Sequence, residues 1–204
     1  MALNKNPILD VFNCYIIGYE CKKKEIKIIM CEKDQADNII INNHYSNKPT
    51  KNSFLNFLVY YKNKAKGALQ IGYGIRPDIN NGYNKNEIVE FDRMWLSDEM
   101  PKFSETITIS LLHNFLKKRY KKLKYILSYS DTSVGNMGTI YKAANYKLIE
   151  KLKVDFYILE NGERVHPVTM WHRHKTRAKS FLDITYPNWK KAEGEQLKFI
   201  YKLR

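Results

Sequence analysis

The chain has 204 residues, with 35 Lys or Arg against 21 Asp or Glu, and therefore a formal charge of +14. This length predicts one domain with a substantial core, and no apolar run approaches the roughly 20 residues that a membrane span requires. The first residues, MALNKNPILDVF, lack the long apolar segment of a signal peptide, so a soluble cytoplasmic protein is expected.

The positive charge favours nucleic acid as a partner, because each contact of Lys or Arg with a phosphate releases a counterion. The competing explanation is codon bias, since the abundant Lys, Asn, Ile and Tyr are encoded by A/T-rich codons. The cysteines, Cys14, Cys21 and Cys31, show no CxxC spacing. Reduced thiols are therefore expected, a zinc site is not, and the cysteines are weak candidates for a nucleophile.

The patterns of apolar residues predict, in chain order, strands 13–19 and 25–30, a helix over 34–44, a hairpin of strands 54–61 and 68–75, a loop over 76–87, a strand over 88–96, a helix over 104–120, a strand over 125–131, a helix over 138–145, and strands over 147–159 and 164–171. The fold class is therefore α/β, a mixed sheet with helices on its faces. This order resembles that of the GNAT acyltransferase fold, in which the strands before and after the long helix splay apart around the acyl donor.

The most informative segment is a strand, a glycine-containing loop and a helix over residues 125–146. In an open α/β sheet, the carboxyl end of a strand that feeds a helix is where ligands usually bind. Ser128 and Asp131 stand at this end, and Asp131 can either orient an amine and take its proton or cap the next turn. Tyr141, in the helix, can either donate a proton to a leaving group or pack in the core.

Two further positions carry candidate chemistry. On a strand, Glu90 and Asp92 share one face while Arg93 lies on the other, which gives either a substrate-facing charged cluster or a salt-bridged edge. His44 and Tyr45, after the first predicted helix, can serve as a base with a neighbouring phenol or as a stacking platform. The alternative is a structural His, which is the commoner case.

Ser104 stands at the start of the long helix, whose first N–H groups can bind an anion such as the pyrophosphate of a cofactor. The preceding loop, 97–103, has acidic residues and no glycine, which departs from the glycine-rich, basic loop of GNAT enzymes. Near the carboxyl end, a basic and aromatic segment follows Trp171, and cations beside aromatic rings suit phosphates and unstacked bases. The residues expected to contact DNA are His172, Arg173, His174, Lys175 and Arg177. No metal site is predicted, because His172 and His174 could share a metal only on a strand.

Several motifs together resemble the Mom family of phage DNA-modification proteins: HYS at 44–46, EFDR at 90–93, SYSD at 128–131 and GTIYKAANY at 138–146. The resemblance implies a GNAT-like transferase that converts the adenine N6 amino group to a carbamoylmethyl-type product and so protects phage DNA from restriction in the cytoplasm of the bacterial host. It implies that His44, Tyr45, Asp131 and Tyr141 are catalytic and that Glu90, Arg93 and Ser128 border the substrate. The donor would be acetyl-CoA or another acyl or glycyl compound.

The chain is thus interpreted as one GNAT-like domain over 1–204, with a loose terminus at 1–12 and a basic extension over 172–204. An enzyme that reaches adenine in a duplex must flip it out, and Tyr45, Tyr141 and Trp95 offer aromatic walls. Two alternatives stay open, a CoA-dependent acyltransferase acting on a protein or small amine, and a non-catalytic nucleic-acid-binding protein. By analogy of fold, an exposed sheet edge would allow a homodimer.

Overall fold

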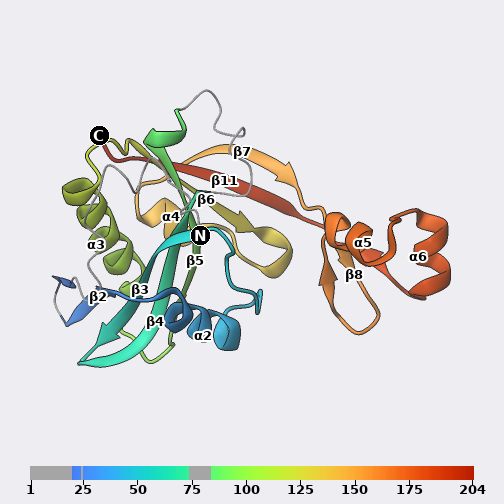
Figure 1. The fold of residues 1–204 in the computed structure, drawn as a ribbon, viewed down its shortest axis with the longest axis horizontal. Coiled ribbons are helices and arrows are strands. Elements are labelled where there is room, and N and C mark those ends of the chain that lie inside the picture. The colour runs from blue at the N-terminus through green and yellow to red at the C-terminus, as the bar shows by residue number, and fades with distance from the viewer. Residues whose placement is uncertain (1–19, 24, 74–83) are drawn as a thin grey trace, which may run out of the picture. The chain divides into compact units, whose positions relative to one another are not determined.

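The structure is a computed structural model that describes residues 20–23, 25–73 and 84–204 (Figure 1). The predicted strand over 13–19 and most of the predicted loop over 76–87 lie outside the described residues. The chain forms two compact units. The first contains the described residues up to Tyr129 with Thr139–Leu148 and Phe199–Arg204, and the second contains Ser130–Gly138 and Ile149–Lys198.

The main sheet is mixed, as predicted. Among the described residues its strands are β1 Glu20–Lys23, β2 Ile26–Met30, β3 Ser53–Tyr61, β4 Lys64–Gly72, β5 Ile88–Leu96, β6 Tyr125–Asp131, β7 Lys147–Lys153 and β11 Glu195–Lys202, in the order β1-β2-β3-β4-β5-β6-β11-β7. Neighbours from β1 to β5 are antiparallel, and β5 pairs with β6 in parallel. The long crossover that a parallel pair requires is the connection through helix α3, Ser104–Arg119.

Helices α2, Lys33–Asn43, and α3 cover opposite faces of this sheet. Neighbouring residues of β3 show the two faces, because side chains alternate along a strand. Phe57 meets Phe115 of α3 edge to face, with ring centroids 5.0 Å apart. On the other face Asn56 accepts a hydrogen bond from Gln70 Nε2 at 3.0 Å, and the same nitrogen donates to Asp37 of α2 at 2.7 Å. The described part of the chain contains no helix that is both long and apolar enough to cross a membrane.

Strands β3 and β4 form the predicted hairpin, but its turn is much shorter than the loop over 62–67 that the predicted strand ends imply. Tyr61 pairs with Lys64, so only Lys62 and Asn63 connect the strands, and both have positive φ angles, 48° and 63°. Two residues with positive φ form the tight turn whose twist matches that of the strands it joins. Strand β4 therefore begins four residues earlier than predicted, at Lys64 rather than at position 68.

The second unit has a small sheet and its own core. Its strands β8 Tyr157–Ile158, β9 Arg164–Val165 and β10 Lys190–Lys191 are ordered β10-β8-β9, and its helices are α5 Pro167–His174 and α6 Lys179–Thr185. The buried residues of its core are Leu159, Val165, Met170 and Leu182. Much of the region predicted as a basic extension, 172–204, is thus folded into α5, α6, β10 and β11.

The strand predicted over 164–171 is wrong. Only Arg164 and Val165 are extended, and α5 begins at Pro167. Proline suits the first position of a helix, and the ring nitrogen of His166 accepts a hydrogen bond from the Val168 N–H at 3.1 Å. The His-Pro pair therefore starts a helix where the apolar pattern alone suggested a strand. The strand predicted over 147–159 is likewise two strands, β7 and β8.

Strand β5 contains a one-residue bulge. Phe91 pairs with Ile71 of β4, but the next pair along the ladder joins Arg93 to Gln70, so Asp92 is an extra residue. A bulge reverses the alternation of side chains beyond it. Glu90 and Arg93, which an unbroken strand would place on opposite faces, therefore lie on the same face, the one covered by α2.

Strands β5 and β6 share only a short parallel ladder, from Ile88 with Tyr125 to Phe91 with Ser128. Strand β5 continues for five residues past this ladder, to Leu96. The predicted splay of the two strands around the long helix is therefore confirmed. The bulge at Asp92 and the end of the ladder at Ser128 fall at the same level of the sheet.

Candidate active site

Seven side chains of the first unit gather where β5 and β6 part. We call them the site cluster: His44, Tyr45, Glu90, Asp92, Arg93, Ser128 and Tyr141. Electrostatic interactions link them, since Arg93 acts on His44, Asp92 and Tyr141, and Glu90 acts on Asp92 and Tyr141. Six of the seven were predicted as site residues from the sequence, and the seventh, Asp92, was named there only as the neighbour of Glu90 in a possible charged cluster.

His44 ends helix α2 and is 9% exposed. Burial, and secondly the charge of Arg93, lower the pKa of His44 to about 4, so the ring is neutral at neutral pH. Its Nδ1 accepts a hydrogen bond from the Ser46 N–H at 3.2 Å and lies 2.8 Å from the Ser46 hydroxyl. A neutral imidazole carries one proton, so that proton is on Nε2. His44 therefore offers a hydrogen-bond donor, whereas the sequence suggested a base.

Tyr45 differs from its neighbour in exposure. Its side chain is 55% exposed, and its ring lies 4.2 Å from the His44 ring, centroid to centroid, at a tilt of 35°. A large exposed ring beside a buried polar one is a platform on which a planar ligand can stack. Trp95, the third aromatic wall suggested by the sequence, instead packs against the apolar cluster beneath α2 formed by Cys31, Ala36, Ile40 and Ala68.

The Asp92 carboxyl group of the site cluster has a strongly raised pKa. Burial, and secondly the charge of Glu90, raise its pKa to about 8, against a smaller opposing effect of Arg93. The interaction with the Glu90 side chain acts in the same direction as burial, so Asp92 keeps its proton at neutral pH. Within the described residues, Asp92 Oδ2 has no hydrogen-bond partner of standard geometry. The sequence predicted that Glu90 and Asp92 lie on one face of the strand. It gave no reason to expect that Asp92 would be protonated at neutral pH.

We expect Asp92→Asn to change how stability depends on pH. The folded protein holds a proton on Asp92 up to about pH 8, whereas the unfolded chain loses it near pH 4. The contribution of Asp92 to the free energy of unfolding is therefore full below pH 4 and is lost as the pH rises to 8. Asn stays neutral, so the wild type should lose on the order of 1–3 kcal/mol relative to Asp92→Asn between pH 5 and pH 8. Urea titrations at both pH values measure this, with the exposed Asp98→Asn as the control, and parallel wild-type and Asp92→Asn curves would contradict it.

Tyr141 is 8% exposed and lies in helix α4, Thr139–Ala143. Burial raises its pKa well above the usual range of a phenol, which keeps its proton in place at neutral pH. Its ring packs edge to face on Phe91, with centroids 6.2 Å apart. The hydroxyl of Ser128, which is fully buried, interacts with the phenol and opposes the effect of burial on its pKa. The predicted acid therefore carries the proton that such a role requires.

Asp131 belongs to the second unit, and both of its oxygens have partners there. Oδ1 accepts hydrogen bonds from the Ser133 N–H at 2.9 Å and the Ser133 hydroxyl at 2.5 Å, and so caps a short 3₁₀ turn, Thr132–Val134. Oδ2 accepts one from Arg164 Nη2 at 2.8 Å. The cap, which the sequence left open as the alternative to a catalytic role, is thus present in the structure.

We expect Asp131→Ala to destabilise the protein by about 1–3 kcal/mol, since it leaves the Ser133 N–H without its acceptor and removes the charged partner of Arg164, whose Nη2 keeps only the Ser133 hydroxyl at 2.7 Å. Asp131→Asn keeps an oxygen for the cap and should cost less. Denaturant unfolding with limited proteolysis of the second unit measures both. Asp155→Ala, which removes an exposed ion pair with Lys191 3.4 Å long, is the matched control. An Asp131→Ala protein as stable as the wild type would contradict the structural role.

Ser104 is buried, and its hydroxyl donates to the Pro101 carbonyl at 2.5 Å. Its side chain therefore holds the loop before α3. Phe103, just before the helix, has a left-handed backbone with φ 69° and is 73% exposed. A cofactor at the start of α3 would therefore contact backbone N–H groups and the exposed Phe103 ring.

The five residues predicted to contact DNA lie on α5 and just after it. Arg173 is paired with Glu163 at 2.6 Å and 3.1 Å, and His174 Nε2 lies 2.7 Å from the Tyr186 hydroxyl, so both side chains have partners within the second unit. His172, Lys175 and Arg177 are exposed. Arg177 lines a hollow of about 350 Å³ with Val168 and Trp171, whose ring is 50% exposed.

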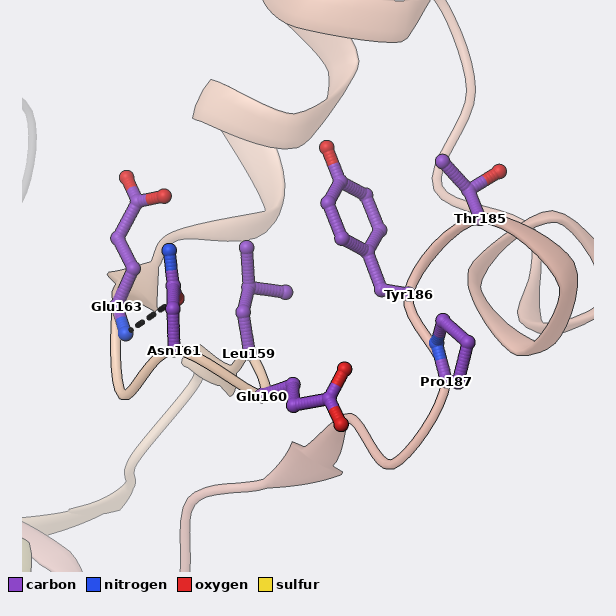
Figure 2. Close-up of a pocket in the computed structure, with 7 residues that line it drawn as sticks. All are labelled: Leu159, Glu160, Asn161, Glu163, Thr185, Tyr186 and Pro187. Atoms are coloured by element: carbon purple, nitrogen blue, oxygen red, sulfur yellow. Dashed lines mark hydrogen bonds between the residues drawn. The ribbon is translucent and has the colours of Figure 1, made fainter.

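Figure 2 shows a second hollow of this unit, of about 340 Å³, between the β8–β9 loop and the end of α6. The carboxylates of Glu160 and Glu163 line it together with the Tyr186 ring, and Asn161 accepts a hydrogen bond from the Glu163 N–H at 2.9 Å. Two acidic side chains make it a poor site for phosphate. Across residues 20–23, 25–73 and 84–204, no three His, Cys, Asp or Glu side chains are grouped as metal ligands would be. Burial raises the pKa of Cys31 to about 11, which makes it a poor nucleophile.

Two solved acetyltransferases have a fold similar to that of this chain. The ribosomal-protein-S5-alanine acetyltransferase of Vibrio fischeri matches 90% of this chain and 96% of its own, with a TM-score of 0.53 and 10% identity. A probable GNAT-family acetyltransferase of Chromobacterium violaceum matches 94% of this chain and 90% of its own, with a TM-score of 0.52 and 8% identity. The predicted GNAT-like fold is confirmed.

Sequence comparison identifies the family. The methylcarbamoylase Mom of Escherichia phage Mu is 32% identical over 173 residues, which cover 80% of this chain and 68% of that protein. The model of the Mom protein family matches residues 25–204, a range that includes the whole site cluster. The chain belongs to the Mom protein family.

Proposed function

We propose that this protein is a phage-type transferase that modifies the N6 amino group of adenine in DNA, with a carbamoylmethyl-type product that protects the DNA from restriction in the bacterial cytoplasm. The observation that carries the proposal is the site cluster, in a chain that is related to the Mu methylcarbamoylase. It combines an exposed ring, a neutral imidazole, paired carboxyl groups, a guanidinium and a protonated phenol.

The reaction forms a bond between adenine N6 and a carbon of the donor, while N6 loses a proton and the donor loses its leaving group. Adenine would stack on Tyr45, and the Glu90 carboxylate would accept a hydrogen bond from the exocyclic amine and then take the proton that N6 loses. The Nε2–H of His44 and the guanidinium of Arg93 would polarise a carbonyl oxygen of the donor. Tyr141 would give its proton to the leaving group.

A purine inside a duplex is stacked and cannot reach buried groups such as Tyr141, so the base must be flipped or unpaired. The charge of the chain supports binding of the strand. The second unit has ten Lys or Arg against eight Asp or Glu, so most of the +14 charge is carried by the rest of the chain. We therefore assign most phosphate contacts to the first unit. His172, Lys175 and Arg177, beside the exposed ring of Trp171, are proposed as a smaller contact with an unstacked base.

The donor is proposed to be an acyl-CoA or another acyl or glycyl compound. An acidic phosphate of such a donor would meet the first N–H groups of α3. The loop before α3 contains Asp98 and Glu99, and Glu99 is paired with Lys66. This pairing neutralises part of the negative charge that would otherwise repel the donor.

Expression in a bacterium that lacks related genes tests the function. Host DNA is digested to nucleosides, and adenosine adducts are measured by mass spectrometry for the wild type and for His44→Ala. We expect an adduct in the wild type and its loss in the variant, and the added mass identifies the transferred group. Absence of any adduct, with soluble DNA-binding protein in the cell, would overturn the proposal and favour the acyltransferase or binding alternatives.

A further inference from the structure

The loop that follows α2, residues 44–52, borders the site cluster at both of its ends. Its first two residues belong to the site cluster. At its other end, the Asn52 carbonyl oxygen lies beside Gly72, and so does Asp92 of the site cluster. A Cβ on Gly72 would be 2.8 Å from that carbonyl oxygen and 2.3 Å from Asp92 Oδ2. The side chains that this short loop carries therefore lie at the rim of the site.

Hydrogen bonds hold the first half of the loop in one conformation. The Asn47 N–H donates to the His44 carbonyl at 2.8 Å, and the Ser46 N–H donates to His44 Nδ1 at 3.2 Å. The Ser46 hydroxyl oxygen also lies 3.3 Å from the Lys48 carbonyl oxygen. These bonds fix the backbone of Tyr45 and Lys48 relative to the imidazole of His44.

The loop carries positive charge and no negative charge. Between Asp37 and Asp78 the sequence contains no acidic residue, and its basic residues include Lys48 and Lys51. Both lysines are exposed, and within the described part of the chain neither takes part in an ion pair. Two ammonium groups that no carboxylate neutralises are thus placed in the same short loop as the Tyr45 ring.

A nucleotide that has left the duplex stack has the two features that this loop complements. Its base is a flat ring that stacks on aromatic side chains, while the phosphates on either side of it stay outside the pocket. Tyr45, which is 55% exposed, offers the ring. Lys48 and Lys51 offer cations for the phosphates. An uncharged amine substrate would leave both cations without a partner.

We propose that the loop 44–52 is a clamp for the DNA strand, in which Lys48 and Lys51 hold the phosphates next to the adenine that stacks on Tyr45. The inference rests on the proposed function, because that function makes an extruded adenine the substrate. It assigns the position of the strand at the site to one loop, whereas the net charge of the first unit assigns it to no particular residue. The two lysines contact phosphate alone and take no part in the chemistry.

The salt dependence of DNA binding tests the clamp without any reaction. Fluorescence anisotropy measures binding of a labelled DNA duplex that contains one mismatched adenine, at several salt concentrations. Each phosphate contact adds about 0.9 to the steepness with which log affinity falls against log salt concentration. We expect Lys48→Ala/Lys51→Ala to reduce this slope by about 2 and to weaken binding about 10-fold or more near 0.1 M salt. Lys48→Arg/Lys51→Arg keeps both charges and should keep the slope.

Lys121→Ala/Lys122→Ala is the matched control. These two lysines are exposed, belong to the first unit and lie just before β6, whereas the site cluster lies toward the carboxyl end of that strand. Their replacement removes the same charge and should leave the slope unchanged. An equal fall of the slope in the control and in Lys48→Ala/Lys51→Ala would assign binding to the general charge of the protein and overturn the proposal. An unchanged slope in Lys48→Ala/Lys51→Ala would overturn it as well.

The same measurement reads the stacking of adenine. The wild type should bind the mismatched duplex about 5-fold or more tightly than a fully paired one. Tyr45→Ala should lose this preference, and Tyr45→Phe, which keeps a ring, should retain it. Equal binding of both duplexes by the wild type would contradict the clamp.

Failure of the clamp and failure of the proposed function give different results. If the wild type shows the expected slope and the preference for unpaired adenine but forms no adduct in cells, the proposed reaction fails and the clamp stands. If the wild type forms the adduct while Lys48→Ala/Lys51→Ala binds with the wild-type slope, the clamp fails and the reaction stands.

Discussion

Replacement of Tyr141 by Phe should lower adenine modification by about 100-fold or more while leaving the protein folded. The substitution removes one oxygen, and a general acid typically contributes about 10²- to 10⁴-fold to a rate. The Phe ring keeps the packing of Tyr141 on Phe91, and on Phe199, whose ring centroid lies 5.5 Å away. Adduct yield per cell and the urea midpoint of the purified protein measure the two expectations.

Tyr60→Phe is the matched control for this loss. Tyr60 lies on β3, is half-buried, and has the Lys27 ammonium 5.6 Å from its ring centre, outside the site cluster. It should modify DNA at the wild-type level. Wild-type adduct yield in Tyr141→Phe would remove the phenol from the mechanism, and an equal loss in both variants would point to a general effect of losing a hydroxyl.

Gly72→Ala should have the largest effect on stability, a loss of about 3 kcal/mol in the free energy of unfolding. An added Cβ would lie 2.3 Å from Asp92 Oδ2 and 2.8 Å from the Asn52 carbonyl oxygen, both far inside contact distance. The backbone oxygen cannot move without disturbing β3, and displacement of Asp92 would also move its partner Glu90. Urea titration measures the loss, which should be accompanied by loss of adduct.

Two comparisons separate the causes. Gly162→Ala places a Cβ in open space but at φ 79°, so it reports the cost of backbone conformation without a clash, about 1 kcal/mol. In the Asp92→Ala background, Gly72→Ala should cost less than in the wild type, because one of the two clashing atoms is gone. If the two losses simply add, Asp92 does not fill the space beside Gly72.

Much of the site was predictable because its residues fall at the ends of strongly patterned elements. His44 follows a short helix, Ser128 lies on a strand that feeds a helix, and Tyr141 lies inside that helix, which are positions that the chain order alone identifies. Partners contributed by distant segments were not predictable. Arg164, which pairs with Asp131, lies 33 residues further along the chain. The Tyr146 hydroxyl lies close to His113, which the sequence does not distinguish from the other core residues of α3.

Local geometry explains the other differences. In the turn, Lys62 and Asn63 both have positive φ angles, although neither is a glycine. The residue types therefore gave no signal for a two-residue turn at this position. Helix α5 was not predicted because its residues, PVTMWHRH, are as typical of a strand as of a helix. The bulge at Asp92 has no signature in the sequence, and it is the reason that Arg93 lies on the face opposite to the predicted one.

That bulge also determines how β5 can change in length. Loss of one residue from a paired strand normally turns every following side chain to the opposite face, which is among the most damaging changes a sheet can suffer. Asp92 is surplus to the ladder, since Phe91 and Arg93 already pair with the consecutive residues Ile71 and Gln70. A deletion at this one position would straighten the strand and keep Arg93, Met94 and Trp95 facing as they do now. An alignment of relatives that keeps strict register through β5 should therefore need its single-residue gap at Asp92.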